Sequence, residues 1–122
     1  MRRVLSGSTD VIRYTGRRSG RRVTTPTQYA RYGDGIVILV GRPDTKKWWR
    51  NFRGSARGIE LLLDGRWVSM TARAIVGADE PEAARPLLDA YLTRFPRAIG
   101  SLGDGTADQQ VRRAVLVHCR PG

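Results

Sequence analysis

The segment from Ile59 to Val76 constrains the fold most, because it has the pattern of two strands joined by a tight turn. Apolar and polar residues alternate along its second arm, so one face of that arm is apolar. The apolar positions are Val68, Met70, Ala72, Ala74 and Val76, and they alternate with Trp67, Ser69, Thr71 and Arg73. The pair Asp64-Gly65 between the arms is typical of a two-residue hairpin turn. A chain built on this hairpin is expected to form an antiparallel sheet.

Further strands are expected on both sides of this hairpin. They cover residues 11–15, 22–32, 36–40 and 111–119, with a turn signal at Gly33-Asp34-Gly35. Asp44 is a good N-cap for a helix running to about Arg53, and acidic residues with Pro81 open a second helix over 79–95. Pro96 ends that helix, and residues 100–108 are expected to form a loop. Six strands with two short helices predict a mainly β fold, a small closed or split antiparallel β-barrel.

Length and composition fit one domain over residues 1–122, with residues 1–10 expected to be a flexible N-terminal segment. The chain has 122 residues, of which 40% are hydrophobic. No run approaches the roughly 18 apolar residues of a membrane span, and the N-terminus lacks the apolar core of a signal peptide. The one cysteine, Cys119, cannot form an internal disulfide. These features predict a reducing, cytoplasmic environment.

The charge is uneven along the chain. The net charge is +11, and residues 1–57 carry all of it, with 14 basic and 3 acidic side chains against 8 of each in residues 58–122. Such a bias predicts an anionic partner, which could be a phosphate-rich cofactor, a nucleic acid or an anionic membrane surface. The alternative is a basic surface that contacts only solvent. This alternative accounts for the number of arginines better than it accounts for their clustering in the first half of the chain.

Three segments of the basic half could form a site. Residues 15–22 hold two glycines, a serine and four arginines between two strands, and they fit equally a backbone anion nest or a basic loop without a ligand. Pro26 lies inside the strand 22–32, so that strand is an edge or bulges there. Trp48, Trp49 and Phe52 share one face of the helix expected at 44–53, and the opposite face is basic. That helix could wall an aromatic cofactor, stack against single-stranded nucleic acid or contact a membrane surface.

The sequence offers few catalytic side chains. The single histidine, His118, falls in the expected last strand and is interpreted as a partly buried strand residue. No Ser-His-Asp set can be assembled without it, and no His/Cys cluster has metal-ligand spacing. The catalytic residues stay unknown, and if the protein is an enzyme, a bound cofactor would carry the difficult chemistry.

Three motifs in order resemble the deazaflavin-dependent nitroreductase family of oxidoreductases, over roughly residues 12–99. They are the loop Gly16-Arg17-Arg18-Ser19-Gly20-Arg21, the strand with the internal Pro26, and the segment Trp48-Trp49-Arg50-Asn51-Phe52. Some members have an arginine two or three residues before the proline, where this chain has Val23 and Thr24, with Arg22 one position away. The resemblance implies an FMN-binding split-barrel-like fold, a homodimer and coenzyme F420, with FMN and haem as alternative cofactors.

The resemblance also implies roles for individual residues. The phosphate and acidic tail of the cofactor would contact the loop residues Arg17, Arg18, Ser19, Gly20 and Arg21. The deazaflavin would lie against Thr25 and Pro26, its ring and tail would be flanked by Val40, Gly41 and Arg42, and Trp48 and Asn51 would close the site. Apolar surface from the three tryptophans would be buried in the dimer.

The function implied is an oxidoreductase that transfers a hydride from the reduced deazaflavin to a small-molecule acceptor, a quinone, nitro compound or enone. Tyr29 or solvent are the candidate proton donors. Two alternatives stay open, a basic β-barrel that binds single-stranded nucleic acid and a cofactor carrier that does not react. The first is disfavoured, because the aromatic residues cluster on one expected helix rather than alternating along strands.

Overall fold

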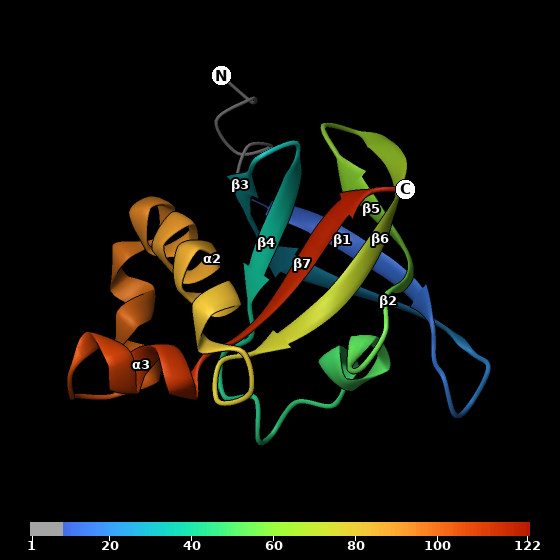
Figure 1. Cartoon of the computed structure of the whole chain (residues 1–122). Helices are drawn as coiled ribbons and strands as arrows, with labels where there is room; N and C mark the ends of the chain where they lie inside the picture. The colour runs from blue at the N-terminus through green and yellow to red at the C-terminus, as the bar shows by residue number, and fades with distance from the viewer. Residues whose placement is uncertain (1–8) are drawn as a thin grey trace.

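The structure is a computed structural model that describes residues 9–122, and it consists of one curled sheet with helices at one side and one end (Figure 1). The elements follow in the order β1 (Thr9–Thr15), β2 (Arg22–Gln28), β3 (Ala30–Tyr32), β4 (Gly35–Leu39), η1 (Trp48–Phe52), β5 (Arg57–Leu63), β6 (Arg66–Val76), α2 (Pro81–Arg94), η2 (Pro96–Leu102), α3 (Ala107–Arg113) and β7 (Val115–Pro121). None of the helices within residues 9–122 combines the length and apolar character that a membrane span requires.

The sheet is antiparallel throughout and has the strand order β2-β1-β5-β6-β7-β4-β3. Its two edges, β2 and β3, are consecutive in the chain, and the connecting Tyr29 is fully buried. The chain therefore leaves one edge of the sheet and joins the other, which curls the sheet into a split barrel. The expected single strand over 22–32 is wrong in this respect: it divides at Tyr29, because its two parts pair with different neighbours, and the sheet has seven strands rather than six.

The expected hairpin turns are confirmed. Asp64 and Gly65 connect β5 to β6, and both have positive φ angles, 52° and 78°. This is the backbone conformation that an Asp-Gly pair adopts readily and that matches the twist of two antiparallel strands. Gly33, with φ 58°, lies in the turn between β3 and β4.

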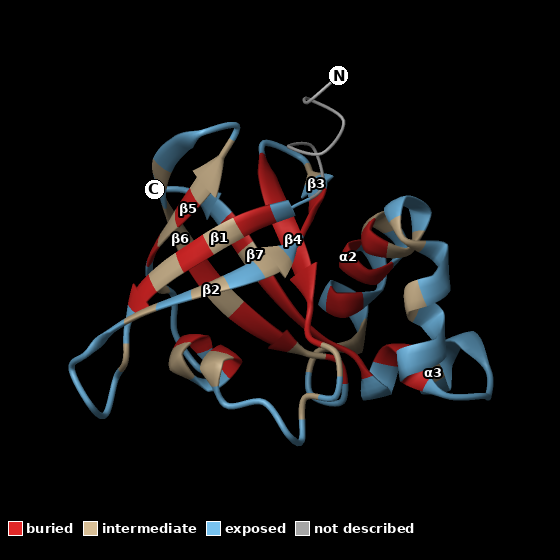
Figure 2. Ribbon diagram, turned by 180° about the vertical axis from the view of Figure 1, so that it is seen from behind, coloured by how far each residue is buried: buried red, intermediate tan, exposed pale blue. Residues whose placement is uncertain are grey.

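Two clusters of buried side chains lie on opposite faces of the sheet. The first fills the inside of the barrel and includes Ile12, Ile36 and Phe52. The second lies between the outer face of the sheet and α2, whose buried side is turned toward β4 (Figure 2). All five residues of β4 are therefore buried, which agrees with the continuous apolar run seen in the sequence.

Four local expectations differ from the structure, in whole or in part. The expected helix over 44–53 is only the short η1, because the preceding residues form a turn in which the Thr45 hydroxyl and amide both donate to the Arg42 carbonyl. The expected loop over 100–108 holds the end of η2 and the start of α3, and the expected strand over 111–119 forms as β7 but begins only at Val115, because α3 occupies the residues before it. Thr106 and Gln109 form a capping box that begins α3, and this signal was missed. The expected flexible segment 1–10 is partly wrong, because Thr9 and Asp10 begin β1, whereas residues 1–8 lie outside the described residues.

Candidate functional site

Two pockets of similar size open side by side near the edge strand β2. The basic pocket, of about 420 Å³, is lined by Tyr14, Gly16, Arg17, Arg18, Ser19, Val23, Lys47, Trp48, Arg50 and Asn51. The split pocket, of about 400 Å³, is lined by Thr25, Pro26, Thr27, Gln28, Ile38, Leu39, Val40, Gly41, Lys46, Trp48, Tyr91, Ala98 and Ser101. Trp48 lines both pockets, so one half-buried indole stands where they meet.

The split pocket lies where the sheet is interrupted. Its lining comes from β2 and from the end of β4, and within residues 9–122 no hydrogen-bonded ladder joins these two strands. The main-chain groups along the free edge of β2 are therefore not used by a neighbouring strand. Pro26 has no N–H and lies in this edge strand, where proline is tolerated. The expectation that the strand is an edge at Pro26 is confirmed.

One face of β2 connects the two pockets. Side chains alternate along a strand, so Val23, Thr25 and Thr27 share a face, and all three are half-buried. Val23 lines the basic pocket, whereas both threonines line the split pocket. Their partners across the β1–β2 ladder are Tyr14, Ile12 and Asp10, which are buried inside the barrel.

The loop between β1 and β2 is held by its own hydrogen bonds. The amide of Gly16 donates to the carbonyl of Arg21 at 2.8 Å, and the amide of Gly20 donates to the carbonyl of Gly16 at 2.9 Å. The amide of Arg21 donates to the Ser19 hydroxyl oxygen at 3.1 Å. The amides of Gly16, Gly20 and Arg21 are therefore used within the loop itself. The loop offers the basic pocket the side chains of Arg17 and Arg18 instead.

Asn51 joins this loop to η1. Its Oδ1 accepts a hydrogen bond from the Arg17 amide at 2.8 Å, and its Nδ2 donates to the Trp48 carbonyl at 2.7 Å. Both ends of the amide are used, so Asn51 sets the position of the arginine loop relative to the indole. The resemblance implies that Asn51 closes the site, and the structure adds this role in holding the loop against η1.

Two basic side chains that were not singled out in the sequence complete the basic pocket. Lys47 and Arg50 line it together with Arg17 and Arg18, and within residues 9–122 no acidic side chain does. The signal was the basic face of the segment around Trp48, which places these residues on the side turned toward the loop. The electrostatic potential of such a pocket favours an anion.

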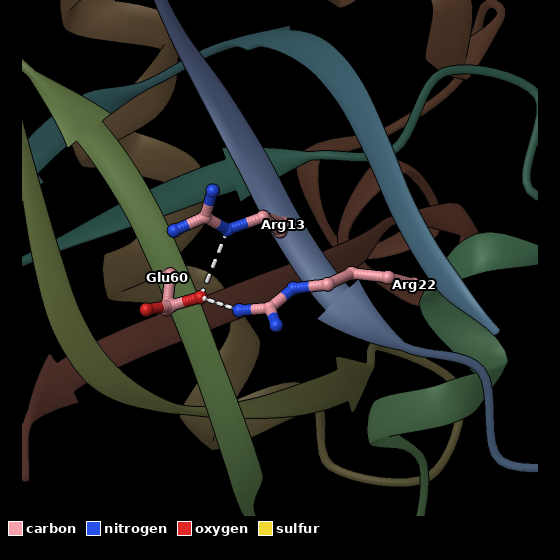
Figure 3. Close-up of polar contacts among 3 residues, drawn as sticks. All are labelled: Arg13, Arg22 and Glu60. Carbon is pink, nitrogen blue, oxygen red and sulfur yellow. Dashed lines mark hydrogen bonds and ion pairs between the residues drawn. The ribbon is translucent and has the colours of Figure 1, made fainter. Parts of the chain in front are cut away.

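Arg22 lies elsewhere. Figure 3 shows its guanidinium beside that of Arg13, both on one oxygen of the Glu60 carboxylate. The Glu60 Oε1 atom is 2.6 Å from Arg22 Nη2 and 2.9 Å from Arg13 Nε. These bonds to Arg13 and Arg22 hold the pKa of Glu60 below its usual range. Arg22 therefore lines neither pocket.

The structure brings together most of the residues predicted from the sequence. Those that line the basic or the split pocket are Arg17, Arg18, Ser19, Thr25, Pro26, Val40, Gly41, Trp48 and Asn51. Gly20 and Arg21 line neither, although both hold the shape of the loop. Arg42, whose φ is 52°, lines a third pocket together with Pro43 and Trp49.

Asp10 is a buried carboxyl directly behind the split pocket. It is 1% exposed, and its Oδ1 accepts a hydrogen bond from the hydroxyl of Thr27, the residue opposite it in the ladder. Its Oδ2 has no hydrogen-bond partner among residues 9–122. Burial raises the pKa of Asp10 from 3.8 to about 6, although the Thr27 hydrogen bond acts in the opposite direction.

Other titratable groups are placed less favourably for chemistry in these pockets. Tyr29, a candidate proton donor, is fully buried and lines neither pocket. Tyr91 of α2 lines the split pocket, and burial raises its pKa. His118 lies in β7, where burial lowers its pKa, and lines a separate pocket. Within residues 9–122 no group of three or more His, Cys, Asp or Glu side chains could hold a metal ion.

Solved structures share this fold at low sequence identity. The FAD and heme binding protein from Mycobacterium smegmatis superposes with a TM-score of 0.59 at 18% identity, over 100% of this chain and 67% of that one. An F420-H2 dependent reductase, FDR-A, superposes with a TM-score of 0.58 at 13% identity, over 93% of this chain and 94% of that one. HutZ, a heme storage protein from Vibrio cholerae, superposes with a TM-score of 0.56 at 13% identity, over 95% of this chain and 82% of that one.

The sequence also matches a protein family. No match was found among curated proteins. Residues 3–94 match the family described as F420H(2)-dependent quinone reductase. That range includes the arginine loop, both strands that line the split pocket, and the segment with Trp48 and Asn51. The agreement of this match with the split-barrel fold shows that the chain belongs to the F420H(2)-dependent quinone reductase family.

Proposed function

We propose that this chain is an F420H2-dependent oxidoreductase that reduces quinones and holds its cofactor across the basic and split pockets. One observation carries the proposal: a pocket with four basic side chains and a pocket at an open strand edge meet at Trp48. Each has a volume of about 400 Å³, and cofactor sites usually have volumes of about 300–1,000 Å³. A cofactor with an aromatic ring and an acidic tail needs both environments.

The residues present fit such a cofactor. The phosphate and acidic tail would contact Arg17, Arg18, Lys47 and Arg50, since guanidinium and ammonium groups donate charge-assisted hydrogen bonds to phosphate oxygens. The ring would lie in the split pocket, where the unused main-chain edge of β2 offers hydrogen-bonding groups and Trp48 offers an aromatic wall. The reduced deazaflavin supplies a hydride when bound.

The chain's own contribution would be to bind, orient and exclude water. The side chains that line the split pocket are mostly uncharged, and the acceptor would enter this pocket beside the ring. Fixing the two reactants next to each other accounts for much of the rate in reactions of this kind. Nitro compounds and activated enones would accept a hydride by the same geometry, and we propose them as secondary substrates.

Among the alternative cofactors, the structure favours a flavin over haem. Haem iron in proteins is often bound by histidine. The single histidine of the chain, His118, lines a pocket formed by β6, β7 and the end of the chain, separate from the two described above. A flavin would use the same ring and phosphate contacts as the deazaflavin.

The binding test is titration of the purified protein with deazaflavin, FMN and haem, followed by absorption. The double variant Arg17→Ala/Arg18→Ala should bind the deazaflavin about two to four powers of ten more weakly, because each charge-assisted contact contributes about 1.5–3 kcal/mol. The matched control is Arg66→Ala/Arg97→Ala, which removes the same charge from exposed positions outside both pockets. If the first variant binds as tightly as wild type, or if single-stranded oligonucleotide displaces the cofactor, the assignment of the basic pocket is wrong.

We also propose that the protein is a homodimer. Trp49 is buried in the core, but Trp67 on the outer face of β6 remains 42% exposed. A known structure of similar fold is described as a domain-swapped dimer. Light scattering that shows only monomer at high protein concentration would contradict this proposal.

A further inference from the structure

The pair formed by Asp10 and Thr27 has no evident purpose in the stability of the fold. The two residues face each other across the β1–β2 ladder, and the Thr27 hydroxyl donates to Asp10 Oδ1. Asp10 is 1% exposed, and its second oxygen has no hydrogen-bond partner among residues 9–122. A buried carboxyl with only part of its hydrogen-bonding capacity used destabilises a protein. An apolar residue at this position would pack in the barrel without that cost.

Thr27 connects this carboxyl to the split pocket. Its side chain is half-buried and lines the pocket, whereas Asp10 lies behind it. A hydroxyl has one proton to donate and two lone pairs that accept. When Asp10 is a carboxylate, the Thr27 proton is directed toward Asp10, and the hydroxyl can only accept from a molecule in the pocket. When Asp10 is a carboxylic acid, its proton can point to the Thr27 oxygen, and the Thr27 proton then points into the pocket.

We propose that Asp10 supplies a proton through the Thr27 hydroxyl to the oxygen of a quinone bound in the split pocket. This inference rests on the proposed function, which places the acceptor in that pocket. Transfer of a hydride to a quinone delivers two electrons and one proton, so one oxygen of the product still lacks a proton. As the new bond from that oxygen to hydrogen forms, the Thr27 O–H bond breaks, and Thr27 takes the proton of the Asp10 carboxylic acid. A solvent proton restores Asp10 through Thr27 after the product leaves, and the proton that the cofactor loses with the hydride passes to solvent.

The surroundings of Asp10 favour its protonated form over the carboxylate. The other titratable side chains whose pKa values it affects are Tyr29, Tyr91 of α2 and Cys119 of β7. Burial raises the pKa of all three, so they are neutral near pH 7 and offer no positive charge to a carboxylate. Burial also raises the pKa of Asp10 itself to about 6. A proton donor works best when its pKa is close to the working pH.

The experiment compares Thr27→Val, Thr27→Ser and Asp10→Asn with the wild type in single-turnover reduction of a soluble benzoquinone by protein loaded with reduced deazaflavin. Thr24→Val is the matched control, since Thr24 is an exposed residue of the same strand. We expect Thr27→Val and Asp10→Asn to react about 100-fold more slowly, the usual contribution of a general acid. The double variant should be no slower than either, Thr27→Ser should restore the rate, and Thr24→Val should match the wild type. Multiplicative effects in the double variant, or a wild-type rate in Thr27→Val, would overturn the proposal.

A second measurement does not depend on turnover. Infrared difference spectra of the cofactor-free protein should show a carboxylic-acid C=O band that disappears as the pH rises through about 6, and this band should be absent in Asp10→Asn. Thr27→Val should shift the band, because the hydrogen bond from the Thr27 hydroxyl to Asp10 is lost. If the band is absent in the wild type, the proton source is wrong while the proposed function stands. If the wild type neither binds the deazaflavin nor reduces the quinone, the proposed function fails and this inference fails with it.

Discussion

The stability of Asp10→Asn relative to the wild type should increase as the pH rises. The direction of this change follows from the pKa of the Asp10 carboxyl. Its pKa is 3.8 in ordinary surroundings and about 6 in the folded protein. Between these values the folded state binds more protons than the unfolded state, so the free energy of unfolding falls as the pH rises. Below pH 3.8 the Asp10 carboxyl is protonated in both states, and its full contribution to the free energy of unfolding is present. Above pH 6 the carboxyl is charged in both states, and that contribution is lost. Asparagine does not titrate and keeps an oxygen that can accept from Thr27.

The magnitude follows from the size of the rise. A pKa that increases from 3.8 to about 6 corresponds to about 3 kcal/mol of stability lost between acid and neutral pH. This figure is an upper limit, because the interior can relax or admit water around a charged carboxylate. Domains of this size have a free energy of unfolding of about 5–15 kcal/mol, so the effect is a substantial fraction of the total.

Urea unfolding of the wild type and Asp10→Asn at intervals from pH 3.5 to pH 8 measures this directly. Subtracting one free energy from the other removes the titration of all other groups. The variant should gain up to about 3 kcal/mol over the wild type across this range, with most of the change between pH 4 and pH 6.5. A difference that is constant with pH would refute the reasoning, because Asp10 would then ionise alike in the folded and unfolded states.

Three further predictions follow from local geometry and charge. A Cβ added to Gly77 would lie 1.8 Å from a main-chain carbonyl oxygen, so Gly77→Ala should lower the free energy of unfolding by more than about 2 kcal/mol. Gly58→Ala, where nothing lies within 4 Å, should change it by less than about 1 kcal/mol in the same urea assay. Asn51→Ala removes the acceptor of the Arg17 amide and should weaken deazaflavin binding about tenfold, with faster hydrogen exchange at that amide, whereas unchanged affinity would show that the loop holds its position without this bond. Raising the salt concentration from 0.05 M to 0.5 M should weaken deazaflavin binding to the wild type, and equal affinity at both would show that the basic pocket contributes no charge attraction.

The sequence indicated the family and most of the residues around the site, because those signals are short and chemical. Arginines, glycines and serine in one loop, a proline in a strand and a Trp-Asn segment are all visible without a structure. It was less informative about Lys47, Arg50 and Thr27, which belong to common residue types in unremarkable positions. Asp10 was assigned to a flexible segment, because one carboxylate near a chain end has no pattern that indicates burial.

The sequence by itself determined the features that depend only on residues close to one another in the chain. The hairpin at Asp64-Gly65 and the antiparallel sheet follow from backbone preferences at turns and from alternation along strands. Tertiary structure alone decided that the strand 22–32 divides at Tyr29, since each part is held by a different neighbour far away in the chain. That division separates β2 from β4, creates the split pocket and places Thr27 between it and Asp10. Such pairings depend on contacts between distant segments, which no local pattern encodes.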